Sequence, residues 1–281
     1  MRNTLRSQWE IQKWLTKYQI NNYQLCIDDT YGFIVNVDGD VNLHNLKLLS
    51  IDVQFGYVAG NFLCSNNKLD SLSGCPHTVQ GNFNCSQNLL TSLKDGPKNV
   101  DNDFDCSSNF LSNLVYCPET VQGSFNCRKN EITRFIQLPK IIGKNFICSY
   151  NQINSLIELT INIGQSIDCS YNNINTLHGS PENIYGNFDC SYNNLKTLKY
   201  CPRKIEGTFD FSHNSIAQLD IHHFPHIVDK DIFHAGNSLT QYAKFHDFFS
   251  LKAILENEFL NQSLLSINTN NLQYPAYKLN N

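Results

Sequence analysis

Residues 186–198 read GNFDCSYNNLKTL, and close copies of this stretch recur every 21 residues along the chain. The spacing is clearest at the cysteines, which stand at Cys64, Cys85, Cys106, Cys127, Cys148, Cys169 and Cys190. Self-similarity at a fixed period of about 20 to 50 residues is the signature of a solenoid or another repeat architecture. The period therefore indicates the fold class before any single residue is interpreted.

Other columns keep the same period. An apolar residue, usually phenylalanine, stands two positions before each cysteine, and leucine or isoleucine stands five positions after it. The column three positions after the cysteine is all asparagine: Asn67, Asn88, Asn109, Asn130, Asn151, Asn172, Asn193 and Asn214. Phe-x-Cys predicts a short strand with both side chains on one face, and the asparagine is expected to bond backbone groups at the turn that follows. One 21-residue unit cannot bury its apolar face alone, so neighbouring units must stack.

The repeats divide the chain into three parts. Eight copies occupy residues 58–225. Residues 1–57 are expected to form a helix with Ile11, Trp14, Leu15 and Tyr18 on one face, then a hairpin and a capping coil. Residues 226–281 are expected to hold a degenerate repeat around Asn237 and a helical cap marked by Phe248, Leu251, Leu255 and Phe259.

The segment from Phe188 to Leu195, Phe-Asp-Cys-Ser-Tyr-Asn-Asn-Leu, resembles the last four consensus positions of the leucine-rich repeat. Its residue pattern is most similar to the short Asn- and Cys-rich repeats of bacterial and bacteriophage proteins, and it is also similar to the repeats of secreted bacterial leucine-rich repeat effectors. The resemblance implies a leucine-rich repeat solenoid with a parallel β-sheet on the concave face and short extended or 3-10 segments on the convex side. One extra residue in Val79-Gln-Gly81-Asn-Phe83 suggests a β-bulge at the glycine.

Composition excludes several classes of function. The chain has 281 residues, a net charge of −4 and only 16% charged residues, without the basic stripe of a nucleic-acid binder. No apolar run reaches the roughly 18 to 20 residues of a membrane span. Charged residues interrupt the first fifteen positions where a signal peptide needs an apolar block. We therefore expect a cytoplasmic protein that binds neither nucleic acid nor membrane; delivery into a host cell would use no cleavable signal.

Cysteine and histidine are the candidates for chemistry. Aligned cysteines could hold a metal or act in redox reactions, but no C-x2-C spacing is present and small buried thiols explain the column. The cluster His222-His223-Phe-Pro-His226, near Asp220, could form a metal or catalytic site, and a solvated loop is the alternative. No nucleophile elbow, phosphate loop or zinc-protease motif occurs. We expect no cofactor and no enzyme activity.

The candidate binding residues lie where the repeat does not dictate the side chain. Alternation places Asp168, Asp189 and Asp210 on the outer side of the sheet, and the column two positions after the cysteine holds Tyr150, Tyr171 and Tyr192. Exposed tyrosines dominate binding hot spots, whereas repeat duplication and a structural ladder are the alternatives. The predicted protein-binding residues are Asn126, Arg128, Lys129, Tyr150, Asp168, Tyr171, Asp189, Tyr192, Asp210 and His213.

The predicted function is that of a non-catalytic scaffold which binds a partner protein of unknown identity through its concave surface. The resemblance to bacterial and bacteriophage repeats suggests a bacterial or phage effector that inhibits a host protein. A structural or self-assembling component, or an enzyme or metal site around His222–His226, are the alternatives.

Overall fold

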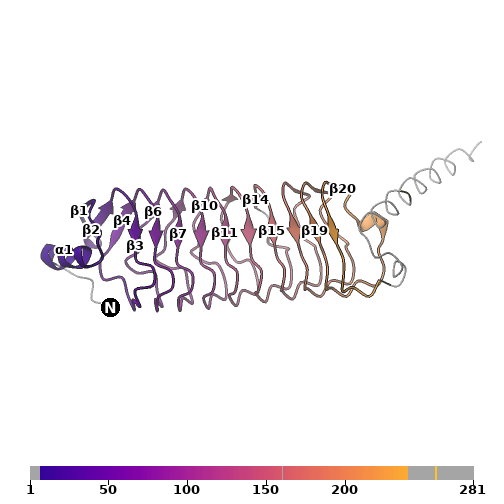
Figure 1. The fold of residues 1–281 in the computed structure, drawn as a ribbon, viewed down its shortest axis with the longest axis horizontal. Coiled ribbons are helices and arrows are strands. Elements are labelled where there is room, and N and C mark those ends of the chain that lie inside the picture. The colour runs from indigo at the N-terminus through magenta and orange to yellow at the C-terminus, as the bar shows by residue number, and fades with distance from the viewer. Residues whose placement is uncertain (1–6, 160, 240–256, 258–281) are drawn as a thin grey trace, which may run out of the picture.

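The computed structural model describes residues 7–159, 161–239 and 257, and these form an elongated stack of coils with a helix near one end (Figure 1). Each coil contributes two short strands: one joins a ten-stranded sheet, and the other joins an eight-stranded or a three-stranded sheet. The Phe-x-Cys segments build a ten-stranded sheet, here called the Phe sheet. Its strands are β3 (Val41–Asn42), β5 (Phe62–Leu63), β7 (Phe83–Asn84), β9 (Phe104–Asp105), β11 (Phe125–Asn126), β13 (Phe146–Ile147), β15 (Ile167–Asp168), β17 (Phe188–Asp189), β19 (Phe209–Asp210) and β21 (Ile232–Phe233).

The second sheet was not predicted. Its first eight strands are β1 (Tyr23–Asp28), β2 (Gly32–Val37), β4 (Phe55–Val58), β6 (Thr78–Val79), β8 (Asn99–Val100), β10 (Thr120–Val121), β12 (Ile141–Ile142) and β14 (Asn162–Ile163). A separate three-stranded sheet holds β16 (Asn183–Ile184), β18 (Lys204–Ile205) and β20 (Ile227–Val228). The prediction of a single parallel sheet is therefore corrected to two strands per coil.

The expected bulge at the glycine is also wrong. Strand β6 ends at Val79 and β7 begins at Phe83, both side chains are fully buried, and neither strand shifts register against its neighbours. The extra residue makes a corner between two strands instead. At this corner a Cβ atom on Gly81 would lie 2.7 Å from the carbonyl carbon of Gly60 in the preceding coil, so the coils meet too closely for a side chain.

The interior follows the sequence columns. The Phe62 and Phe83 rings stack with centroids 5.6 Å apart, and Phe83 stacks on Phe104 at 5.5 Å. All seven cysteines of the column are buried free thiols, as predicted, and burial raises the pKa of Cys169 well above its usual range. The core is thus a set of apolar ladders that run along the stack.

The asparagine column connects the coils as predicted. The Asn172 side-chain amide donates to the carbonyl oxygens of Cys148 in the preceding coil and of Cys169 in its own coil, both at 3.1 Å. Its Oδ1 accepts from the Ile153 N–H at 3.0 Å. Because each coil repeats these bonds, every described turn of the repeat is tied to the coil before it.

The two ends hold the predicted elements in part. Helix α1 (Gln8–Lys17) buries Ile11, Trp14 and Leu15, and Trp14 packs edge-on against Phe55 of β4. Strands β1 and β2 pair antiparallel as the expected hairpin. The predicted C-terminal helix around Phe248, Leu251, Leu255 and Phe259 lies outside the described residues. The domain boundaries at 57 and 225, and the direction in which the stack curves, stay predictions.

The ninth, degenerate repeat is present. Strand β21 pairs with β19, and the Asn237 side chain bonds the Phe211 carbonyl and the Ile216 N–H as the earlier asparagines do. The two inserted residues are absorbed by a 3-10 helix at Ile221–His223. Helix α1, with ten residues, is too short to cross a bilayer, and no other helix in the described part of the chain could do so.

Candidate binding face on the Phe sheet

The position two residues after the cysteine has an unusual backbone. Its residues adopt positive φ angles of 50–56° in every coil from Asn45 to His213, which is the left-handed region. Asparagine and glycine tolerate this conformation best, and a bulky side chain there costs on the order of 1 kcal/mol. The first coils carry Asn45 and Asn66, as the backbone favours, whereas the later coils carry tyrosine. Three tyrosines therefore stand where the local backbone does not favour them.

These tyrosines form one continuous stack with their neighbours. The rings of Tyr150 and Tyr171 have centroids 4.2 Å apart, and Tyr171 and Tyr192 are 4.1 Å apart. His213 continues the stack at 4.1 Å from Tyr192. We call Tyr150, Tyr171, Tyr192 and His213 the aromatic ladder. The three tyrosines remain 37–39% exposed, so the ladder presents ring edges and hydroxyl groups to solvent.

Both ends of the aromatic ladder are closed. The Arg128 guanidinium carbon lies 4.5 Å from the centre of the Tyr150 ring, and the Lys129 ammonium lies 5.9 Å from it, so cations cover the first ring. At the other end a Cβ atom on Gly236 would lie 2.5 Å from Nδ1 of His213. Only glycine fits beside that ring in this backbone. A ligand can therefore reach the ring edges, but it cannot slide onto an outer face of the stack.

The phenol of Tyr171, in the middle of the ladder, is perturbed by its neighbours. The side-chain hydrogen bond with Tyr192 is the largest cause that raises the pKa of Tyr171, followed by burial and by a bond with Tyr150. The Tyr171 hydroxyl therefore stays protonated and able to donate throughout the physiological range. A shallow depression lined by Tyr150, Tyr171, Tyr192 and His213, together with Asn173, runs along the ladder.

The three aspartates of the predicted binding face stabilise turns and are also partly exposed to solvent. Asp168, Asp189 and Asp210 occupy directly paired positions on β15, β17 and β19. Each uses Oδ1 to accept the backbone N–H two residues later, at 2.9–3.1 Å. All three side chains are half-buried. Burial is the main cause that raises the pKa of Asp189, the Ser191 hydrogen bonds oppose it, and the charges of Asp168 and Asp210 raise it further.

Asn126 completes this row and has a positional role. Its Oδ1 accepts the Arg128 N–H at 3.1 Å, and this bond fixes the turn that carries Arg128 and Lys129. Ile147 stands between Asn126 and Asp168 in the row. The structure thus brings the ladder and its two cations together, and it brings the three aspartates together in a neighbouring row.

Two features were missed from the sequence. The closing role of Gly236 was missed, although a glycine one position before Asn237 stands in the left-handed column of the degenerate repeat. The left-handed column was also missed, although asparagine at positions 45 and 66 was a readable signal for such a backbone.

The histidine cluster has a different geometry from a metal site. His223 Nδ1 lies 3.2 Å from Asp220 Oδ2, and the His222 N–H donates to Asp220 Oδ1 at 3.0 Å, so the aspartate holds the 3-10 turn. The Cys201 thiol donates to the His223 carbonyl at 2.9 Å. Within the described residues no three His, Cys, Asp or Glu side chains are grouped in a way that could hold a metal ion.

Comparisons with known proteins give few matches. No family model matches the chain, and no curated protein matches it. One similar solved structure is YopM from Yersinia enterocolitica WA-314, with 21% sequence identity and a TM-score of 0.38. The similarity covers 72% of this chain and 58% of that chain, so this chain spans less than two thirds of the length of YopM.

Proposed function

We propose that this protein is a non-catalytic interaction scaffold that binds a partner protein through the outer face of the Phe sheet between residues 126 and 213. The observation that carries the proposal is the aromatic ladder, because three exposed tyrosines occupy left-handed positions where asparagine would be easier to accommodate. Exposed tyrosine supplies large rigid contact area and a hydroxyl group, which is why it is common at binding hot spots.

The other predicted contact residues fit this proposal by position. Arg128 and Lys129 would meet the partner at one end of the ladder, and His213 at the other. Asn126, Asp168, Asp189 and Asp210 would contact it from the neighbouring row. We propose that this face is the concave surface expected of a leucine-rich repeat. The more specific proposal is that the protein is an effector that acts on a host protein.

The test compares capture of proteins from host and bacterial lysates by the wild type and by the triple variant Tyr150→Asn, Tyr171→Asn, Tyr192→Asn. Asparagine keeps the left-handed backbone, as Asn66 does at the same position. We expect at least one partner bound by the wild type to be lost from a folded variant. The same set of captured proteins in both samples would contradict the proposal.

A self-assembling component is the second candidate. Strand β3 lies at one edge of the Phe sheet and pairs only with β5 within the described residues, so its other edge could pair with a strand of another copy. Light scattering at high protein concentration distinguishes the two candidates, because a scaffold stays monomeric and a stacking component grows with concentration.

A further inference from the structure

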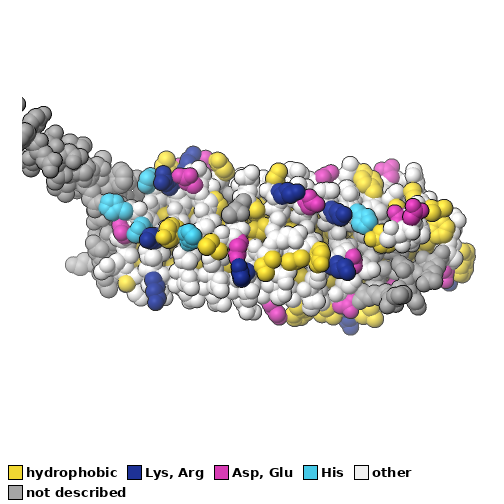
Figure 2. All heavy atoms as spheres, turned by 180° about the vertical axis from the view of Figure 1, so that it is seen from behind, with side chains coloured by type: hydrophobic (Ala, Val, Ile, Leu, Met, Phe, Trp, Pro, Cys, Tyr) yellow, Lys and Arg dark blue, Asp and Glu magenta, His cyan; other side chains and the backbone are white. Residues whose placement is uncertain are grey.

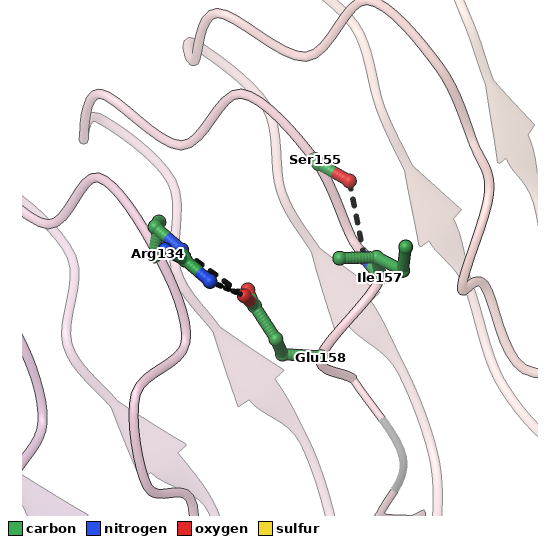
Figure 3. A network of polar contacts seen from close by, with 4 residues as sticks. All are labelled: Arg134, Ser155, Ile157 and Glu158. Atoms are coloured by element: carbon green, nitrogen blue, oxygen red, sulfur yellow. Dashed lines mark hydrogen bonds and ion pairs between the residues drawn. The ribbon is translucent and has the colours of Figure 1, made fainter.

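Three of the ion pairs among the described residues join different coils of the solenoid. Lys140 Nζ lies 3.0 Å from Glu119, and Arg203 Nε lies 3.4 Å from Glu182, each pair exactly one repeat apart in the sequence. The ion pair of Arg134 with Glu158 also joins two coils (Figure 3). The surface in Figure 2 likewise shows basic and acidic side chains side by side along the stack. Stacked repeats in these regions therefore place opposite charges together.

The outer row of the Phe sheet, formed by the second residue of each of its strands, has no such pairs of opposite charge among the described residues. Its ten positions hold Asp105, Asp168, Asp189 and Asp210 and no lysine or arginine. Among the described residues, none of the three consecutive aspartates on β15, β17 and β19 takes part in an ion pair. Neighbouring strands lie about 4.8 Å apart, so like charges repeat at that interval. No cation stands in this row itself, and Arg128 and Lys129 lie at the Tyr150 end of the aromatic ladder.

The aromatic ladder runs beside these carboxylates. Two residues, cysteine and serine, separate Asp168 from Tyr171 and Asp189 from Tyr192. In the next coil Phe211 and Ser212 separate Asp210 from His213. The ring faces are stacked on one another, so ring edges and hydroxyl groups are the parts that meet a partner. The long carbon chains of lysine and arginine pack well along such apolar edges while their charged ends reach a carboxylate.

We propose that the partner protein presents an arginine- and lysine-rich segment to this face, with its cations on Asp168, Asp189 and Asp210 and its side-chain stems along the aromatic ladder. This inference rests on the proposed function and names the chemistry of the partner. Charge complementarity carries it, since three paired positions of this row hold aspartates, none of which takes part in an ion pair among the described residues, and the row holds no lysine or arginine.

The probe is a fluorescent octa-arginine peptide, titrated by anisotropy at physiological salt, with octa-glutamate as the opposite-charge control. The variant is Asp168→Asn, Asp189→Asn, Asp210→Asn. Its fold is expected to persist, because Asn84 and Asn126 hold the same turn through the same Oδ1 atom. The matched control is Glu119→Gln, Glu158→Gln, Glu182→Gln, which changes the net charge equally but away from this face.

We expect octa-arginine to bind the wild type and the glutamate control alike, and to bind the aspartate variant at least about tenfold more weakly. Equal loss in both variants would mean attraction by net charge only and would overturn the inference. Binding of octa-glutamate as tight as that of octa-arginine would overturn it too.

Failure of this inference can be distinguished from failure of the proposed function. If octa-arginine does not bind but the tyrosine variant still loses a captured partner, the face binds proteins and the partner is not basic. If the tyrosine variant captures the same proteins as the wild type, the proposed function itself is wrong.

Discussion

Replacing Asn172 by alanine removes one rung of the asparagine ladder. Its side-chain amide donates to three carbonyl oxygens, those of Cys148, Cys169 and Ser170, and its Oδ1 accepts the Ile153 N–H. The residue is 7% exposed, so water cannot take over these bonds without opening the turn. We expect a loss of stability without a change of fold.

The magnitude follows from which groups keep another partner. The Cys148 carbonyl also accepts from Asn151, the Cys169 carbonyl from Asn193, and the Ser170 carbonyl from the Tyr150 N–H. Only the Ile153 N–H is left without a partner, at about 1–3 kcal/mol. The lost donor bonds add about 0.5–1 kcal/mol each. The sum is about 2.5–6 kcal/mol, a large share of the stability of a typical domain.

The assay is guanidinium unfolding followed by circular dichroism, together with hydrogen exchange at the Ile153 amide. The adjacent Asn173→Ala variant is the matched control, because Asn173 is exposed and only its backbone N–H bonds, to the Ile153 carbonyl. We expect the control to stay within about 0.5 kcal/mol of the wild type. Equal effects of the two variants, or unchanged protection of Ile153, would refute the reasoning.

Three further predictions concern the core and the corners. Burial raises the pKa of Cys117 to about 12 from 9.0, so the folded state holds its proton more tightly. The contribution of this thiol to stability should be complete below about pH 9 and fall by up to about 1.4 kcal/mol per pH unit between about pH 9 and 12, measured as the difference between the wild type and Cys117→Ala in denaturation at several pH values. Iodoacetamide at pH 8 should label Cys26, which is half-buried, before the buried cysteines, and mass spectrometry that finds Cys117 labelled as fast would contradict the burial. Gly164→Ala places a Cβ atom 2.0 Å from the Gly143 carbonyl oxygen, so it should destabilise the fold by at least about 1–3 kcal/mol, and an unchanged melting temperature would show that the corner is looser than described.

The repeat made much of the fold predictable. Each column carries the same side chain in successive coils, so the burial of Phe83 or Cys85 follows from a pattern that eight copies repeat. The second sheet escaped prediction because its strands are two residues long in most coils and include polar positions such as Asn99 and Asn183, which lack the alternation that indicates a strand.

The candidate site was predictable as a set of residues but not as a geometry. Spacing by one repeat placed Tyr150, Tyr171 and Tyr192 on neighbouring coils, and the structure stacks them. The sequence could not show that Asp189 Oδ1 accepts a hydrogen bond from the Ser191 N–H, because that bond depends on the backbone conformation two residues later. The place of Gly236 in the degenerate repeat was readable, but its close approach to the His213 ring was not.

The central claim is that the aromatic ladder serves binding and not stability. In the triple variant Tyr150→Asn, Tyr171→Asn, Tyr192→Asn, the lost stacking costs about 0.5–1.5 kcal/mol per ring pair, and relief of the left-handed backbone returns about 1 kcal/mol per residue. These terms nearly cancel. The decisive measurement is guanidinium unfolding of this variant beside its partner capture. We predict stability within about 2 kcal/mol of the wild type with capture lost; a strongly destabilised variant, or a stable one that captures the same proteins, would contradict the claim.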